Sequence, residues 1–226
     1  MTATTDTLLA ALPADATHHD AERLLRDEGW EPCGAGDWAI ALQSPDGLRV
    51  ARISPFDPVG PYTAALYRQA AQTRLVPELF THRQLEGGGD LMIMERLHPA
   101  DEQDASRFLC TIESGESAVS DLVDVVRRVH ARALAELPWC GPLDENPANV
   151  MSRDDGTLVL IDPYFADGPA LYAAAGSDPD SVAARIPMDQ RRYMTEIPLA
   201  YSGPWPEESR EEMRRGLAAA DARRAG

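Results

Sequence analysis

The chain has 226 residues, 44% of them hydrophobic, which predicts one globular domain of two lobes or two small domains. Its formal net charge of −16 argues against a nucleic-acid partner, because nucleic-acid phosphates bind basic patches. No apolar run approaches the roughly 18 residues that cross a bilayer, and the N-terminus has no basic region followed by an apolar core, so we expect a cytoplasmic protein without a membrane partner.

The reactive side chains exclude some chemistries. Cys33, Cys110 and Cys140 lie far apart and form no C-x-x-C pattern, so we expect three reduced thiols of mostly structural role, and neither a disulfide framework nor a zinc site. The chain also contains no lysine, since its 21 basic residues are all arginines. A site that needs a lysine therefore cannot exist in this chain.

The N-terminal part begins with a helical pattern and then changes period. A short helix is predicted over residues 19–28, because Ala21 and Leu24 share a face and Gly29 is well placed as its C-terminal cap. Residues 30–54 then read as a strand, a glycine turn, a second strand, another turn and a third strand. This order predicts an antiparallel meander.

The first turn of this meander carries two glycines. Gly34 and Gly36 could let backbone N–H groups approach phosphates, as glycine-rich loops do. Ala39 stands where a third glycine would complete the G-x-G-x-x-G pattern, so a plain hairpin is an equally open interpretation.

The third strand carries an arginine. Because side chains alternate along a strand, Val50, Arg52 and Ser54 share one face. The guanidinium of Arg52 can grip a phosphate through its planar fork, although an arginine on a strand also serves as an ion-pair or rim residue. Both roles remain open at this point.

A helix and two more strands complete the first half of the chain. Residues 55–61 form a predicted loop, and residues 62–72 form a predicted helix. Residues 75–83 and 91–97 are apolar segments on either side of a glycine-rich loop at residues 86–90, so they read as two further strands. The first half therefore predicts an antiparallel sheet of five strands.

After Pro99 the pattern turns helical. Apolar residues of the segment 118–137 recur at the spacing of one helix face, which predicts an amphipathic helix, and His130 near its end is interpreted as a packing or capping residue. Further helices are predicted at residues 101–112, 169–175, 178–186, 189–196 and 207–224.

The most informative stretch is residues 143–164. It offers the carboxylate of Asp144, the amide of Asn149, an Asp-Asp-Gly turn and an apolar strand that ends in Asp162. Because Asp-Gly between apolar segments is a strong hairpin signal, we expect Asp162 to fold back toward the loop that carries Asn149. Mg²⁺ takes oxygen ligands and usually only one or two carboxylates, so these residues fit a metal-phosphate site; an ordinary loop and hairpin is the alternative.

The same residues carry a resemblance to a known group of proteins. Asp144-x-x-x-x-Asn149 followed by Asp162 resembles the catalytic loop and the metal-binding motif of the protein-kinase-like superfamily. The Asp-Pro-Tyr run that starts at Asp162 is most similar to the aminoglycoside phosphotransferase type and to small kinase-like proteins of bacteria and phages.

This resemblance implies a two-lobed α+β fold. The N-terminal lobe would cover residues 1–97 and contain the five-stranded antiparallel sheet, with a hinge near residues 94–97. The C-terminal lobe would cover residues 98–226, be mostly helical and reduced in size, and contain the catalytic loop at residues 142–164.

The resemblance also implies ATP and Mg²⁺ as cofactors and a set of site residues. The catalytic residue would orient or deprotonate an acceptor hydroxyl, and the strand arginine would replace the strand lysine of the family. The implied site residues are Asp144 as the catalytic residue, Asn149 and Asp162 as metal ligands, and Arg52, Gly34, Gly36 and Glu95 as nucleotide contacts.

The sequence departs from the family pattern in three places. It has no strand lysine, the helix at residues 62–72 has no glutamate to pair with one, and Pro142 stands in place of the loop histidine. Two functions therefore remain open. One is an ATP-dependent phosphotransferase, and the other is a kinase-like pseudoenzyme that binds a nucleotide or a partner protein without transferring phosphate.

The acceptor is the least constrained part of this interpretation. The resemblance implies a hydroxyl of a small molecule, a peptide or a protein, and the acidic net charge favours a cationic acceptor. Few residues follow Tyr164, so we expect the acceptor site to be reduced, open or completed by a protein partner.

Overall fold

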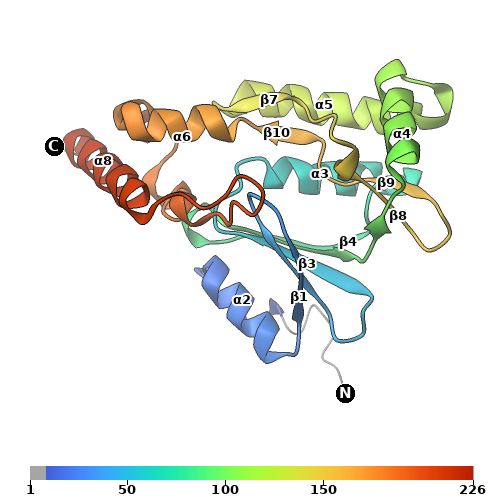
Figure 1. Cartoon of the computed structure of the whole chain (residues 1–226), viewed down its shortest axis with the longest axis horizontal. Helices are drawn as coiled ribbons and strands as arrows, with labels where there is room; N and C mark the ends of the chain where they lie inside the picture. The colour runs from blue at the N-terminus through green and yellow to red at the C-terminus, as the bar shows by residue number, and fades with distance from the viewer. Residues whose placement is uncertain (1–8, 226) are drawn as a thin grey trace.

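The computed structural model describes residues 9–225, which form a β-sheet with helices on both of its faces (Figure 1). Helix α2 (His18–Asp27) covers one face of the sheet. Helix α3 (Gly60–Ala70) lies against the other face, and most of the remaining helices lie beyond it. The sheet is therefore enclosed between an N-terminal helix and the C-terminal half of the chain.

The main sheet has five antiparallel strands in the spatial order β1-β2-β3-β5-β4. The strands are β1 (Glu31–Ala35), β2 (Ile40–Gln43), β3 (Arg49–Ser54), β4 (Leu79–Gln84) and β5 (Asp90–Glu95). On the central strand, Arg52 lies opposite Ala41 of β2 and Met92 of β5. Its backbone is thus held from both sides.

The second half of the chain consists of helices and two small sheets. The helices are α4 (Glu102–Ser114), α5 (Ser120–Glu136), α6 (Gly168–Ser177), α7 (Pro179–Arg185) and α8 (Glu207–Ala225). The strands β6 (His98–Pro99), β8 (Val150–Ser152) and β9 (Leu158–Leu160) form one antiparallel sheet, and β7 (Cys140–Leu143) pairs with β10 (Tyr164–Ala166). Within residues 9–225, no helix combines the length and the apolar character that crossing a bilayer demands.

Side chains of β5 alternate between two apolar layers. Leu91 and Ile93 pack in one cluster with residues of α2, and Met92 and Met94 pack in another with residues of α3 and α5. The second cluster also contains residues of β8 and β9, so one apolar core joins the main sheet to the helical half.

The predicted α+β class, with a five-stranded antiparallel sheet followed by a mostly helical half, is confirmed. The helix predicted at residues 189–196 is wrong, because the segment contains two 3₁₀ turns, Met188–Gln190 and Met194–Glu196. The reason lies in Arg191, whose buried guanidinium donates to the carbonyl oxygen of Ile186 at 2.8 Å and pairs with α8. The backbone N–H groups close short turns in place of a continuous helix, as in the bond from Met194 to Arg191 at 3.1 Å.

Candidate functional site

Asn149 and Asp162 lie at the open end of the β8–β9 hairpin. One step beyond the last pair of its ladder, the N–H of Ile161 donates to the carbonyl oxygen of Asn149 at 2.8 Å. Gly156 in the connecting turn has a φ of 81°, a conformation that glycine adopts without strain. The hairpin expected from the Asp-Gly signal therefore forms, and it brings the loop of Asn149 beside the strand end that carries Asp162.

Asp144 reaches the same place from a different strand pair. Its N–H donates to the carbonyl oxygen of Pro163 at 2.9 Å, next to the pairing of β7 with β10. Oδ1 of Asp144 accepts the N–H of Asn146 at 3.0 Å. The backbone of Asp144 is thus bonded to the residue that follows Asp162.

Both hairpin residues hold a buried polar atom that has no hydrogen-bond partner within residues 9–225. These atoms are Nδ2 of Asn149 and Oδ1 of Asp162. A buried polar group without a partner costs roughly 1–3 kcal/mol, and native proteins contain few of them. The Asp162 side chain is otherwise 38% exposed, so its carboxylate is buried on one side and open on the other. The two unpaired atoms mark a place where a polar ligand would be stabilised.

The donor types at this place fit Mg²⁺. Asp162 offers carboxylate oxygens, and Asn149 offers an amide whose oxygen and nitrogen exchange places by a half-turn of the side chain. Mg²⁺ prefers such hard oxygen donors and completes its coordination with water and substrate phosphates. These two residues would hold the metal ion that the sequence resemblance implies.

Arg52 lies between two carboxylates. Its Nη1 is 2.5 Å from Oδ2 of Asp57, and its Nη2 is 3.8 Å from Oδ2 of Asp162. Burial alone would lower the pKa of Arg52, but the neighbouring carboxylates, Asp57 first, raise it, so the guanidinium stays charged. The close ion pair is with Asp57, and the contact with Asp162 is the looser one.

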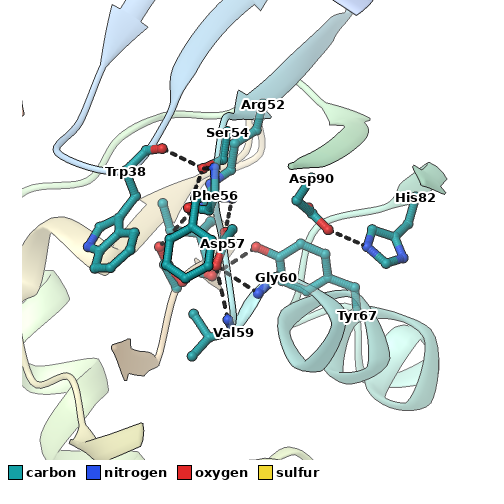
Figure 2. A network of polar contacts seen from close by, with 12 residues as sticks. Trp38, Arg52, Ser54, Phe56, Asp57, Val59, Gly60, Tyr67, His82 and Asp90 are labelled. Atoms are coloured by element: carbon teal, nitrogen blue, oxygen red, sulfur yellow. Dashed lines mark hydrogen bonds and ion pairs between the residues drawn. The ribbon is translucent and has the colours of Figure 1, made fainter. Parts of the chain in front are cut away.

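Asp57 is the site residue that sequence reasoning missed. It lies in the loop between β3 and α3, and only 2% of its side chain is exposed. Its Oδ1 accepts the N–H groups of Val59 at 3.1 Å and Gly60 at 2.8 Å (Figure 2). Asp57 thus binds two N–H groups at the start of α3 and pairs with Arg52, and it provides the acidic partner that α3 itself lacks. The one available signal was an acid three residues ahead of a Gly-Pro helix start.

A second buried acid lies close to this pair. Asp90 begins β5 opposite Ser54, and its Oδ2 is 2.7 Å from Nε2 of His82 (Figure 2). A Cβ on Gly60 would lie 2.7 Å from Cγ of Asp90, so a larger residue at the start of α3 would displace the Asp90 side chain. Burial raises the pKa of Asp90, although His82 and Arg52 oppose this effect. The charge of Arg52 therefore acts on a third carboxylate in addition to its two direct partners.

The surroundings of Asp162 disfavour an isolated negative charge. Burial raises its pKa to about 6 against the effect of Arg52, and three further carboxylates add to the rise. A cation beside Asp162 would offset both effects, because an opposite charge favours the ionised carboxyl group. The electrostatics therefore favour a cation at the unpaired oxygen.

The glycine turn between β1 and β2 is bonded within the protein. Gly34 pairs with Ala41, and the N–H of Gly36 donates to the carbonyl oxygen of Ala39 at 2.9 Å. The carbonyl oxygen of Gly36 accepts the N–H of Ala200 at 3.4 Å, so the C-terminal half contacts this turn. Neither Gly34 nor Gly36 has a positive φ. Their predicted contacts with phosphate stay predictions.

Two side chains strengthen the contact between this turn and the C-terminal half. Oδ1 of Asp37 accepts the N–H groups of Tyr201 at 2.8 Å and Ser202 at 3.0 Å. The ring of Trp38 lies 6.0 Å from the ring of Tyr172 in α6. The oxygens of Gly36 and Asp37 thus hold this turn against the segment 199–202.

Glu95, the predicted hinge residue, is the last residue of β5, and both its N–H and its carboxylate are hydrogen-bonded within the protein. Its N–H donates to the carbonyl oxygen of Glu78 at 3.0 Å, and its carboxylate accepts a hydrogen bond from Arg153 at 2.6 Å. Arg153 also donates to the carbonyl oxygen of Val76 at 2.9 Å. The observed role of Glu95 is to join the main sheet to the β8–β9 hairpin, and its contact with adenine stays a prediction.

A cavity of about 310 Å³ opens beside Asp144. Apolar residues of α4 and α5 form much of its wall. The charged residues that line it are three acids, Glu113, Asp144 and Glu145, and one base, Arg127. An apolar cavity with this excess of carboxylates suits a cationic or neutral molecule better than an anion.

No protein-family model matches the chain, and no curated protein matches it. Among solved structures, the aminoglycoside phosphotransferase APH(4)-Ia is 14% identical over 92% of this chain and 97% of that chain, with a TM-score of 0.36. The aminoglycoside phosphotransferase APH(3'')-Id from Streptomyces rimosus is 18% identical over 90% of this chain and 98% of that chain, with a TM-score of 0.33.

An apo pseudokinase is 11% identical over 83% of this chain and 82% of that chain, with a TM-score of 0.32. These three solved structures are thus two aminoglycoside phosphotransferases and a pseudokinase. At such identities and TM-scores, the likeness transfers neither an activity nor a substrate to this chain.

Proposed function

We propose that this chain is an ATP-dependent phosphotransferase, which moves the γ-phosphoryl group of ATP to a hydroxyl group with Mg²⁺. One observation carries the proposal: Asn149 and Asp162 lie at the end of one hairpin, and each has a buried polar atom without a partner among the described residues. Asp144, the third residue of the motif, is bonded through its backbone to the residue after Asp162. These side chains supply the oxygen donors that phosphoryl transfer requires.

Each side chain has a distinct role in this proposal. Asn149 and Asp162 would hold the metal ion, and bound ATP with Mg²⁺ would supply the transferable group and the charge that stabilises its oxygens. Arg52 keeps its charged guanidinium 3.8 Å from Asp162 and can bind a phosphate oxygen. Asp144 orients the acceptor hydroxyl and accepts its proton. Positioning and charge stabilisation supply most of the rate in such sites.

The acceptor in this proposal enters the cavity beside Asp144. Because Glu113 and Glu145 line that cavity together with Asp144, we expect a cationic small molecule or peptide that carries the hydroxyl group. A protein partner could complete the acceptor site.

A second candidate function, a nucleotide- or partner-binding pseudoenzyme, is favoured by the glycine turn and by Glu95. The carbonyl oxygen of Gly36 and the carboxylate of Asp37 are bonded to the C-terminal half, and the N–H of Gly36 is bonded to Ala39 within the turn. The N–H and the carboxylate of Glu95 are bonded to neighbouring segments. A protein in which these bonds persist would not place a nucleotide for transfer.

Measurements of Mg²⁺-dependent ATP binding and turnover distinguish the two functions. We expect the wild type to bind Mg·ATP and to release ADP in the presence of cationic hydroxyl acceptors. Asp162→Asn should weaken Mg·ATP binding by about tenfold or more, whereas Asp144→Asn should keep binding and lose turnover. The matched control is Asp154→Asn in the turn of the same hairpin, where the side chain is 95% exposed and the substitution should change neither property.

Two outcomes would count against the proposal. Mg·ATP binding without turnover across a broad panel of acceptors would favour the pseudoenzyme. Equal Mg·ATP affinity in Asp162→Asn and in the wild type would contradict the metal assignment, and the proposed function with it.

A further inference from the structure

Two adjacent histidines and a glutamate from the C-terminal half meet at the start of α2. Nε2 of His18 is 3.3 Å and Nε2 of His19 is 3.0 Å from the same atom, Oε2 of Glu196. One ligand atom from each residue lies within 4.8 Å of the other two. Within residues 9–225, no other three histidine, cysteine or acidic side chains are grouped in this way.

Local structure fixes the position of the two histidines. The side chain of Thr17 accepts the N–H of Asp20, and the side chain of Asp20 accepts the N–H of Thr17. This capping box orders the first turn of α2, in which His18 and His19 are the first two residues. Glu196 ends a 3₁₀ turn in the C-terminal half. The cluster therefore connects two segments that are far apart in the sequence.

The ring nitrogens that would bind a metal ion, Nε2 of His18 and Nε2 of His19, share one carboxylate oxygen of Glu196 as their partner. The His18 side chain is only 6% exposed, and its other ring nitrogen, Nδ1, has no partner among the described residues. A single carboxylate oxygen faces both imidazoles, whose ring centroids are 3.9 Å apart. The two Nε2 atoms and the carboxylate oxygen thus lie close together, and a metal ion bound to all three would stabilise this arrangement.

The spacing suits a tetrahedral metal ion. Zn²⁺ binds histidine nitrogen and carboxylate oxygen at about 2.0–2.2 Å, so ligand atoms in a tetrahedral zinc site lie about 3.3–3.5 Å apart. The observed separations of 3.3 and 3.0 Å between the Nε2 atoms and Oε2 are close to this value. One ligand atom of each imidazole lies within 4.8 Å of the other, a separation that the side chains would narrow on binding one ion.

We propose that His18, His19 and Glu196 bind one Zn²⁺ ion. Two imidazoles and one carboxylate form a known zinc ligand set with one open position, and nitrogen ligands disfavour Mg²⁺, which prefers oxygen. Because the His19 side chain is 60% exposed, water can reach the fourth position from solvent. The cysteine pattern that argued against zinc does not bear on this site, since histidine and glutamate supply the ligands.

The bound ion links α2 to the C-terminal half. Helix α2 covers the face of the sheet opposite α3, while Glu196 belongs to the segment that follows α7 (Figure 1). Zn²⁺ bound by these three side chains, with water in the fourth position, would connect these parts of the chain, and this connection is independent of the proposed phosphotransferase activity.

Isothermal titration of the chelator-treated full chain with ZnCl₂ tests the site. We expect one Zn²⁺ per chain, and a loss of affinity of about tenfold or more in His19→Ala and in Glu196→Gln. These two side chains are 60% and 34% exposed, so both variants should fold. The matched control is His98→Ala: Nε2 of His98 is 2.9 Å from Asp154, yet this pair belongs to no group of three among the described residues.

Thermal unfolding tests the connection between α2 and the C-terminal half. ZnCl₂ should raise the Tm of the wild type and of His98→Ala, and should leave the Tm of His19→Ala unchanged, because an ion that binds the folded state stabilises it. Absence of stoichiometric zinc binding in the wild type would overturn the proposal. Zinc affinity that is unchanged in His19→Ala and Glu196→Gln, or reduced equally in His98→Ala, would overturn it as well.

Discussion

The two sides of the charge cluster around Arg52 differ in how completely their polar groups are paired. On the sheet side, Asp57 accepts hydrogen bonds from Arg52 and from two N–H groups at the start of α3. On the hairpin side, Asn149 and Asp162 each keep one buried polar atom without a partner among the described residues. Arg52 touches both sides, at 2.5 Å from Asp57 and 3.8 Å from Asp162.

This difference separates a structural role from a binding role. A buried carboxylate that holds a guanidinium and two N–H groups is satisfied by the protein itself, so Asp57 stabilises the fold and orients Arg52. An unpaired buried oxygen lowers stability unless another group binds it. The hairpin side therefore carries an energetic cost that a bound cation would remove.

The largest effect should come from breaking the paired side. Asp57→Ala removes the closest partner of Arg52 and the acceptor of two N–H groups at the start of α3, so we expect a loss of about 3–5 kcal/mol in the free energy of unfolding, measured by urea denaturation. Asp57→Asn keeps an acceptor for the N–H groups of α3 and loses only the charge. Its free energy of unfolding should therefore lie between those of the wild type and of Asp57→Ala. If Asp57→Ala were as stable as the wild type, the ion pair between Asp57 and Arg52 would not contribute to the stability of the fold.

The unpaired side should respond in the opposite way. Asp162→Asn should weaken Mg·ATP binding by about tenfold, or about 1.4 kcal/mol, while the free energy of unfolding without ligand changes by less than about 1 kcal/mol. Calorimetric titration and urea denaturation of the same preparation measure the two quantities. A loss of stability as large as that in Asp57→Ala would remove the distinction between the two sides.

Asp90 is an intermediate case, since His82 binds one of its oxygens and the other has no partner among the described residues. Burial raises the pKa of Asp90, so the folded state binds its proton more tightly than the unfolded state, and stability falls as the pH rises above about 3.9. Asp90→Asn should therefore raise the free energy of unfolding by about 1 kcal/mol at pH 8, or Tm by about 2–4 °C, and leave both unchanged at pH 4. An equal effect at both pH values in scanning calorimetry would contradict ionisation as the cause.

The smallest effect concerns the glycine turn. Asp37→Ala removes the acceptor for two N–H groups of the segment 199–202, which should cost about 0.5–1 kcal/mol of stability. If nucleotide binding requires this turn to separate, the same substitution should raise Mg·ATP affinity about two- to fivefold.

The neighbouring turn between β2 and β3 provides the matched control. Asp46 there accepts the N–H of Leu48 at 3.0 Å and a hydrogen bond from Ser44, with no link to the C-terminal half in these bonds. Asp46→Ala should cost a similar amount of stability and leave nucleotide affinity unchanged. An increase in affinity in both variants would argue against a specific role of the Asp37 contact.

Most of the fold could be predicted because its signals are local. Alternation and turn residues indicated the five strands of the main sheet, and the apolar stripe at residues 118–137 matches α5 within a few residues. The strands β6, β7, β8 and β10 were not predicted, because segments of two to four residues show no period of their own; β9, equally short, was predicted from the Asp-Gly turn before it. The segment 189–196 was misjudged because its course depends on the buried side chain of Arg191.

The same distinction applies to the candidate site. One turn sets the distance between Asn149 and Asp162, so their approach could be predicted from the Asp-Gly signal. The role of Asp57 could not, because it depends on where α3 begins relative to β3. The hydrogen bond from Tyr201 to Asp37 joins residues that are 164 positions apart, and no local sequence pattern predicts such a contact.

The apolar cluster shared by β5, α5 and β9 limits how the chain can be divided. Met92 and Met94 lie before residue 97, whereas Leu122 and Leu160, which belong to the same cluster, lie after it. A fragment that ended at residue 97 would therefore present a bare apolar surface to water, and its complement would present the matching one. We expect either fragment to aggregate when produced alone and the two to become soluble when co-expressed, so the two halves behave as one folding unit.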